Sequence, residues 1–551
     1  MMRSVMNVRR SAVVMGTFAL IAALGILLSL SAPHIKSDDE LVYLTGALEA
    51  RDGDLPDAYM LQGYEFGPYL HPKVLLAWYE PLGHDAFKSL YLFVLILATG
   101  LAAYALFRLI FLPWVPALLL AVVLLLPRAA AGIEFFGVFT FREAIGRSAA
   151  FPLFLLGSGL LVRRMLERQP LWPVFALFGI FLFLHPVTVT LFAFVALGAV
   201  VVTRLIERTR VVTVIREAFV SGVAFMAAGS YFFVEVFSRL SNTVADTAAP
   251  TAAYVSAVVF RNAWEFPEAS LQWYRHMGVV SACFVLAIAF FYLLPRVRAF
   301  RKRYPFPHAR IVMTWGISMM VLALVLALLA PGLNLYLMEH ANASYIFQQW
   351  SRISKFYYLG LFIAMVPMVG SLWMGFQASA YRYKKGIVVL LVVAGIGSSS
   401  LVFEIAQFAI GYPDYTEAYI PQALSGVPDD ISSSEYRETC AALARMGATS
   451  ADTIVSNDFG LRYYCKSNLN SSFEEGAAYT FLSRSDLVEW HAAYLAQREA
   501  LSTADVSKVF GFATGVSGHF LVLPRIERFV AFTELPGAVV TTRHIVVPVP
   551  E

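Results

Sequence analysis

The chain has 551 residues, of which 58% are hydrophobic and 15% are charged, and its formal net charge is +4. An average soluble domain carries about 25% charged residues, so this composition excludes a soluble enzyme and a disordered protein. The 3 cysteines are too few for a disulfide scaffold. A bilayer core requires roughly 20 apolar residues for each spanning helix, and apolar runs of that kind recur between residues 12 and 411.

These runs predict a polytopic α-helical membrane protein with about eleven transmembrane helices. Arg3, Arg9 and Arg10 precede the first run, which is too long for a cleaved signal and is interpreted as a retained helix. His185 and Pro186 separate two short runs and predict either a tight turn or a break inside one membrane hairpin. The predicted spans are 11–31, 88–107, 111–127, 149–162, 171–185, 187–203, 217–238, 277–295, 311–331, 355–378 and 386–411.

The placement of lysine and arginine in short loops predicts the orientation of these spans. With eleven spans, every basic cluster falls on one side, so the N-terminus is expected in the cytoplasm and the C-terminus outside, in a multi-pass protein of the plasma (inner) membrane. The clusters lie around residues 3–10, 163–168, 204–216, 296–310 and 382–385. The longer loops 32–87, 128–148, 239–276 and 332–354 then lie outside, which indicates that the function resides on that face.

The composition changes near Gly411, where apolar runs shorten and charged residues become frequent. The hydrophobic pattern predicts helices at 435–445 and 485–501. It predicts strands at 452–456, 519–523 and 544–548. We therefore divide the chain into a transmembrane module, 1–411, with its first outer loop at 32–87, and an extracytoplasmic α/β domain, 412–551. Cys440 and Cys465 either form a disulfide or remain two separate buried thiols.

Three consecutive carboxylates, Asp38, Asp39 and Glu40, follow the first span. Like charges this close raise one another's pKa, so one of them is suited to accept a proton from a hydroxyl nucleophile. Oxygen ligands also suit a divalent cation such as Mg²⁺ or Mn²⁺, and Asp38 and Asp39 are the candidate metal ligands. The alternative is a solvated helix cap, with Ser37 or Asp38 as the capping residue.

The second outer loop carries Glu134, Arg142, Glu143 and Arg147 among aromatic residues, immediately before a span. These charged side chains are candidates for binding a substrate or a phosphate. The alternative is structural: Arg142 and Glu143 form a salt bridge, or Glu143 pairs with Arg147 one helical turn further on.

Four more residues are candidates for binding the phosphate of a lipid-linked substrate. Arg352 and Lys355 lie at the predicted outer start of the tenth span, against the positive-inside tendency, and arginine matches phosphate geometry. The alternative for Lys355 is a side chain that extends to the membrane surface. His185 lies near the outer surface, and its alternative is a packing residue that breaks a helix pair. His71 lies in the first loop, just before a predicted interfacial helix.

The sequence lacks the motifs of several other functions. It has no P-loop, dinucleotide fingerprint, HExxH, GxSxG or Cys/His metal spacing. ATP-driven transport and zinc proteolysis therefore have no sequence support, and no nucleic-acid partner is expected.

The layout resembles the GT-C superfamily of integral-membrane glycosyltransferases, which use polyprenyl-phosphate-linked sugars. The resemblance rests on the first outer loop, which opens with Asp38-Asp39-Glu40, on the His71-Pro72 segment, and on the many helices before an outer α/β domain. It implies that Asp38 or Asp39 acts as general base or organises a metal. It also implies that Arg352 and Lys355 hold the donor phosphate, and that the anomeric carbon is inverted.

The partners implied are a polyprenyl-phosphate sugar donor, a glycan, lipid or protein acceptor, and the lipid bilayer. A WWDxG element is absent, which argues against glycosylation of protein asparagines. The alternatives are a transporter or flippase of a lipid-linked or polar solute, and a glycan polymerase or ligase of another fold.

Overall fold

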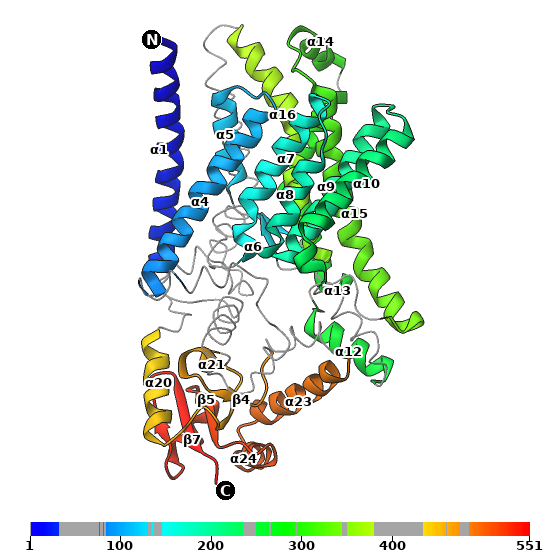
Figure 1. Cartoon of the computed structure of the whole chain (residues 1–551). Coiled ribbons are helices and arrows are strands. Elements are labelled where there is room, and N and C mark those ends of the chain that lie inside the picture. The colour runs from blue at the N-terminus through cyan, green and yellow to red at the C-terminus, as the bar shows by residue number, and fades with distance from the viewer. Residues whose placement is uncertain are drawn as a thin grey trace.

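The computed structural model describes residues 2–31, 77, 81, 84–126, 128–130, 134–136, 146–234, 249–263, 266–293, 295–343, 350–378, 433–458, 460–473 and 484–550. In this part of the chain, a long helical bundle lies above a small α/β domain (Figure 1). The N-terminus is at the upper end of the bundle, and the C-terminus belongs to the α/β domain at the lower end.

Ten of the eleven predicted spans coincide with helices, and the eleventh, 386–411, lies outside the described residues. The helices are α1 (Met2–Ser31), α4 (His84–Leu109), α5 (Trp114–Leu124), α7 (Phe151–Leu166), α8 (Trp172–Ile180), α9 (Pro186–Ile206), α10 (Val211–Ala228), α13 (Pro267–Leu293), α15 (Ala309–Ala341) and α16 (Phe356–Gln377).

Five helical segments of the described residues are long and apolar enough to cross a membrane: Ser89–Leu109, Pro186–Ile206, Val211–Ala228, Ala309–Ala341 and Trp350–Gln377. The described helices therefore establish a bundle of membrane-spanning character but not eleven spans. The 11 residues of α5 rise about 16 Å, roughly half of the bilayer core. With only 9 residues, α8 is shorter still.

Burial differs strongly between the helices of the bundle. In the segment Trp350–Gln377, which contains α16, 78% of the most apolar stretch is buried inside the protein. In α10 the buried share of the corresponding stretch is 17%. Because a helix that is apolar all round needs either protein or lipid on every side, α16 forms the core and α10 presents apolar side chains outward. Gly316 of α15 and Gly360 of α16 allow these two backbones to approach closely.

Short elements interrupt the bundle. They are β1 (Arg128–Ala130), β2 (Glu134–Phe136), α6 (Gly146–Ala149), the 3₁₀ turns η1 (Phe181–Phe183) and η3 (Trp350–Lys355), α12 (Thr251–Arg261) and α14 (Pro295–Arg303). β1 and β2 form an antiparallel hairpin with Ala130 opposite Glu134, and both strands pack against η3. We call β1, β2 and η3 together the hairpin–η3 region.

The α/β domain is built around a five-stranded sheet with strand order β4-β3-β5-β7-β6. β3 is parallel to β4 and β5, whereas β7 is antiparallel to β5 and β6. The elements are α20 (Ser433–Arg445), β3 (Thr453–Val455), α21 (Gly460–Cys465), β4 (Asn468–Leu469), α23 (Arg484–Ser502), α24 (Val506–Gly515), β5 (Phe520–Pro524), η4 (Glu527–Glu534), β6 (Val539–Val540) and β7 (His544–Pro548).

Side chains of the sheet alternate between two apolar cores, as the period of two in a strand requires. Val522 and Val546 pack toward α20 and α21, whereas Leu521 and Ile545 pack toward α24 and η4. Because both faces of the central strands are buried, the strands are continuously apolar, and helices cover the sheet on both sides.

Candidate functional site

The acidic motif predicted to carry the chemistry cannot be placed. The residues Asp38, Asp39, Glu40, His71, Arg142 and Glu143 all lie outside the described residues. Glu134 belongs to β2 and Arg147 to α6, but the side chains of these two residues also lie outside the described part. Among the described residues, no group of three or more His, Cys, Asp or Glu side chains is placed to hold a metal ion. The predicted roles of these residues and of a divalent cation remain predictions.

His185 lies at the break between η1 and α9, as the sequence indicates. It is the N-cap of α9, where its Nδ1 atom accepts a hydrogen bond from the backbone N–H of Thr188 at 3.2 Å. Pro186 follows at the first helical position, where a missing N–H costs nothing. Because Nδ1 is the acceptor, Nε2 carries the hydrogen of the neutral ring. The residue is 7% exposed, so it caps α9 and packs inside the bundle, and its contact with a donor phosphate stays a prediction.

Arg352 and Lys355 both belong to η3, which opens the apolar segment Trp350–Gln377. Lys355 is only 5% exposed, and its Nζ lies 5.8 Å from the ring centroid of Phe356. Because a cation inside a membrane bundle is costly, such a residue is by default a functional candidate.

Arg128, which sequence reasoning missed, is also buried in the hairpin–η3 region. Its guanidinium donates hydrogen bonds to the carbonyls of Val123 at 3.1 Å and Leu126 at 2.8 Å, at the end of α5. It also lies 4.9 Å over the ring of Phe362 in α16. Arg128 thus closes the end of a short helix inside the bundle.

The hairpin–η3 region is an interruption of regular helix inside an apolar bundle. Non-helical backbone at membrane depth is tolerated only where protein buries it or where it lines a cavity. Here β1 and β2 pack on η3, η3 packs on α9 and α15, and β1 packs on α13. This construction places three cationic residues, Arg128, Arg352 and Lys355, in one region of the bundle.

An apolar surface adjoins this region on the outside of the bundle. Phe194 of α9 is 52% exposed, and its ring centroid lies 5.5 Å from that of Trp350 at the start of η3. The outward-facing ring of Phe194 therefore lies beside the first residue of η3.

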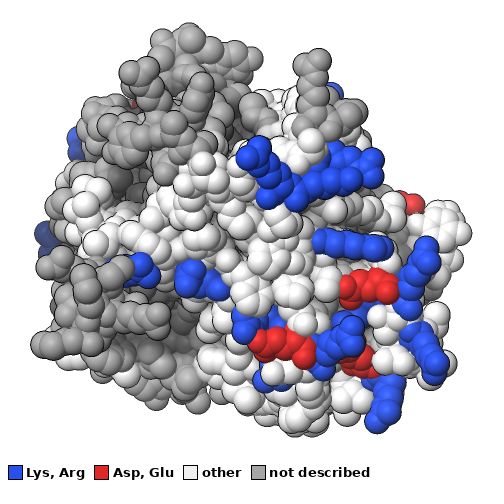
Figure 2. All heavy atoms as spheres, turned by 90° about the horizontal axis from the view of Figure 1, so that it is seen from above, with Lys and Arg blue, Asp and Glu red and all other residues white. Residues whose placement is uncertain are grey.

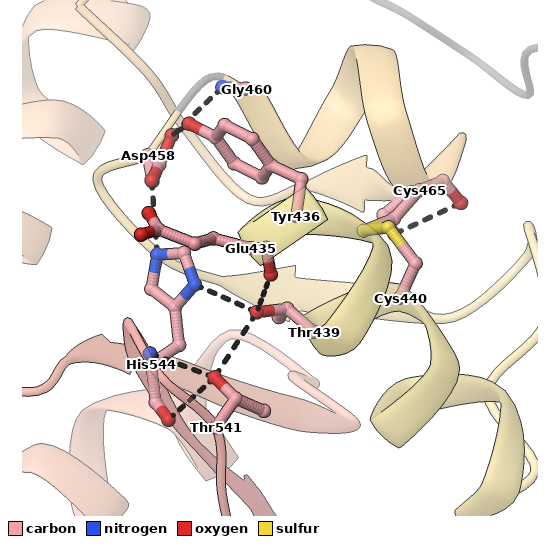
Figure 3. Close-up of a disulfide and its surroundings, with 10 residues drawn as sticks. Glu435, Tyr436, Thr439, Cys440, Asp458, Gly460, Cys465, Thr541 and His544 are labelled. Carbon is pink, nitrogen blue, oxygen red and sulfur yellow. Dashed lines mark hydrogen bonds and ion pairs between the residues drawn. A yellow bond between two sulfur atoms is a disulfide. The ribbon is translucent and has the colours of Figure 1, made fainter. Parts of the chain in front are cut away.

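A second polar cluster lies in the α/β domain and was also missed (Figure 3). Nε2 of His544 lies 3.0 Å from Asp458 Oδ2, and Nδ1 lies 3.0 Å from Thr439 Oγ1. Tyr436 donates to Asp458 Oδ1 at 2.6 Å, and so does the backbone N–H of Gly460 at 2.9 Å. The cluster therefore joins α20, the start of α21 and β7.

Thr439, His544 and Asp458 have the composition of a nucleophile–base–acid triad, but their burial excludes that chemistry. Thr439 is 0% exposed and His544 1% exposed. The Thr439 hydroxyl is also 3.2 Å from the carbonyl of Glu435 and 3.3 Å from Thr541 Oγ1, so its surroundings are filled. No substrate can reach this hydroxyl, and the cluster serves to hold the domain together.

Cys440 and Cys465 form a disulfide beside this cluster (Figure 3). It connects α20 to α21 across a sequence separation of 25 residues. Of the two alternatives that the sequence leaves open, the structure contains the disulfide. Such a bond is typical of an oxidising compartment.

Comparison with models of protein families found no match to this chain. Comparison with curated proteins likewise found no matching relative.

Proposed function

We propose that the chain is a membrane glycosyltransferase of the GT-C type that uses a polyprenyl-phosphate-linked sugar. The observation that carries the proposal is the placement of two cations in η3 inside an apolar bundle: Lys355 is buried and Arg352 is partly buried. Trp350, at the start of η3, contacts the outward-facing ring of Phe194. A lipid phosphate has an anionic group that the two cations would bind and an apolar tail that the apolar outer surface would contact.

In the proposed reaction, an acceptor hydroxyl attacks the anomeric carbon of the donor sugar while Asp38 or Asp39 accepts its proton. The bond between the anomeric carbon and the phosphate oxygen breaks, and the polyprenyl phosphate leaves with the electron pair. Attack from the opposite face inverts the anomeric carbon. Arg352 and Lys355 stabilise the negative charge on the departing phosphate.

The proposed orientation puts the basic upper end of the bundle in the cytoplasm and the α/β domain outside the plasma membrane. The Cys440–Cys465 disulfide supports this orientation, because such bonds persist outside the cytosol. Alkaline phosphatase fused after residue 420 is expected to be active, and fused after residue 303 inactive. The reverse pattern contradicts the orientation.

The catalytic assignment is tested with the purified full chain in nanodiscs and a panel of polyprenyl-phosphate sugars. The wild type is expected to bind polyprenyl phosphate and to release it from a donor. Asp38→Asn combined with Asp39→Asn should abolish release but leave binding intact. Lys355→Met should weaken binding, whereas Lys508→Met on the α/β domain serves as the unaffected control. A wild type that fails to bind polyprenyl phosphate, or a double variant with full activity, refutes the proposal.

A transporter or flippase is the second candidate, and the interrupted helices favour it. The break at His185 and the 3₁₀ turn before α16 are the kind of discontinuity from which transporters build sites for anions and other solutes. Reconstituted vesicles separate the two functions: a flippase moves the intact lipid-linked sugar across the bilayer, whereas the transferase releases polyprenyl phosphate.

A further inference from the structure

The upper face of the molecule is strongly basic (Figure 2). Lys and Arg side chains gather there, with few carboxylates among them. The face is formed by the turns that join α4 to α5, α7 to α8 and α9 to α10, together with α14 and the start of α15.

Printed contacts join these turns into one surface. Phe111, between α4 and α5, lies 4.4 Å beneath the guanidinium of Arg163 and 5.7 Å from the ring of His308. Arg310 donates to the carbonyl of Ile206 at 3.3 Å, which ties the start of α15 to the end of α9. The basic residues of separate loops are therefore held together by the fold.

The carboxylates on this face do not neutralise it. Glu167 pairs with Arg163, and Glu207 and Glu217 both pair with Arg204. Among the described residues, these three are the ion pairs found on this face. No carboxylate occurs in the sequence between Glu268 and Glu339, a stretch that contains α14.

α14 is a two-sided helix on this face. Its apolar side faces the bundle: Phe300 approaches α16 so closely that a Cβ atom at Gly375 would lie 2.4 Å from Phe300 Cζ. Arg301 is directed inward as well, since it donates to the carbonyl of Tyr292 at 3.0 Å and so closes the end of α13. Arg298, Lys302 and Arg303 remain exposed on the other side.

We infer that α14 lies in the plane of the membrane surface and that Arg298, Lys302 and Arg303 form a binding site for anionic phospholipid headgroups. The face closes one end of an apolar bundle, so the headgroups of the adjoining leaflet are the anions nearest to it. An amphipathic basic helix is the structure that binds such headgroups. The bound phosphates supply the negative charge that this stretch of the chain lacks. The site is independent of the proposed transferase activity.

The experiment uses the purified full chain in a neutral detergent. Phosphatidylglycerol and phosphatidylcholine with the same acyl chains are titrated in, and bound lipids are counted by native mass spectrometry. We expect the wild type to prefer phosphatidylglycerol and the preference to weaken with salt. Each basic residue near an anionic leaflet is worth about fivefold in affinity.

Three variants make the test specific to α14. Arg298→Gln with Lys302→Gln and Arg303→Gln should lower the affinity for phosphatidylglycerol at least about tenfold. Arg298→Lys with Arg303→Lys keeps the charge and should keep the affinity. Arg445→Gln with Arg498→Gln and Lys508→Gln removes three charges from the α/β domain and should change nothing. Equal affinity for both lipids, equal loss in the α14 and control variants, or full competition by inorganic phosphate overturns the inference.

Discussion

Asp458 joins two helical segments and a strand through one carboxylate. Its Oδ1 accepts from Tyr436 and from the N–H of Gly460, and its Oδ2 faces His544 and, at 3.5 Å, Arg543. Burial by itself would raise the pKa of this carboxyl. The hydrogen bond and electrostatic interaction with His544, the hydrogen bond from Tyr436 and the charge of Arg543 outweigh burial and hold the pKa of Asp458 below its usual range.

The α/β domain is therefore expected to be acid-labile. A carboxyl whose pKa is lowered on folding stabilises the native state fully above its unfolded pKa of about 3.9, and this stabilisation is lost as pH falls through the folded pKa. Asp458→Asn should cost about 2 kcal/mol at pH 7 and flatten the loss of stability between neutral and acid pH. Chemical unfolding of the full chain across this range measures both effects, with Glu499→Gln as the exposed control. If the unfolding free energy of Asp458→Asn depends on pH as that of the wild type does, another group causes the acid sensitivity.

The disulfide beside Asp458 makes a separate contribution. Closing a loop of 25 residues removes conformational freedom from the unfolded chain, which by the chain-entropy argument is worth about 3 kcal/mol. We expect Cys440→Ala combined with Cys465→Ala to lower the unfolding free energy by that order. A reductant should destabilise the wild type to the same extent and leave the double variant unaffected. A wild type indifferent to reductant contradicts the prediction.

At the scale of elements, the contact between α15 and α16 depends on two glycines. A Cβ atom at Gly360 would lie 2.6 Å from the carbonyl oxygen of Gly316 and from the backbone nitrogen of Met320. Gly360→Leu should therefore force these helices apart and cost about 2 kcal/mol or more. Gly332, also in α15, has open space around its Cβ position, so Gly332→Leu is the matched control. Thermal unfolding in detergent compares the two, and equal stability would mean that the helices separate without cost.

Apolar runs predict the helices of the bundle well but not where they end. The run at 111–127 is predicted to be a span, yet α5 ends at Leu124, and Arg128 donates to the carbonyl oxygens of Val123 and Leu126 at that end. Hydropathy alone does not reveal this, because the burial of Arg128 depends on Phe362, far away in the sequence. The break at His185 is predictable, since a proline at the first helical position and a capping side chain are local signals.

The candidate site is predicted unevenly for the same reason. Arg352 and Lys355 stand out in the sequence because cations at the predicted outer end of an apolar run oppose the positive-inside tendency. His544 and Asp458 gave no such signal, because their partnership exists only once β7 has paired with β5 and packed beside α20. The carboxylates Asp38 and Asp39 remain a prediction from sequence.

At the scale of the whole molecule, two contacts between described residues attach the α/β domain to the bundle. Phe87, near the start of α4, joins the apolar core that includes Tyr436 and Leu443 of α20. On the other side, α23 packs against α12 and the end of α15 through a cluster that includes Trp490 and Met338. A domain attached at two separate places cannot rotate freely beneath the bundle, so it covers that end in one orientation.

Arg484 is the polar centre of the second attachment. Its guanidinium donates to Asn342 Oδ1 at 2.8 Å and to the carbonyl of Ala343 at 3.2 Å, and it lies 4.3 Å over the ring of Tyr254. Asn342 itself is the C-cap of α15 and lies in the left-handed region, with φ of 48°, so Arg484 binds the turn that ends α15. The side chain is 2% exposed, which strengthens these bonds by removing water from them.

Arg484→Ala is therefore expected to release the α23 side of the domain while the sheet stays folded. Removing one partner of a buried, charged hydrogen bond lowers the stability of the contact by about 2–3 kcal/mol. Limited proteolysis between residues 344 and 483 should therefore become faster in the variant. Arg498→Ala, an exposed arginine on the same helix, is the control and should behave like the wild type. If proteolysis of Arg484→Ala matches the control, the aromatic contacts of Trp490 and Phe260 hold the domain in place without the arginine.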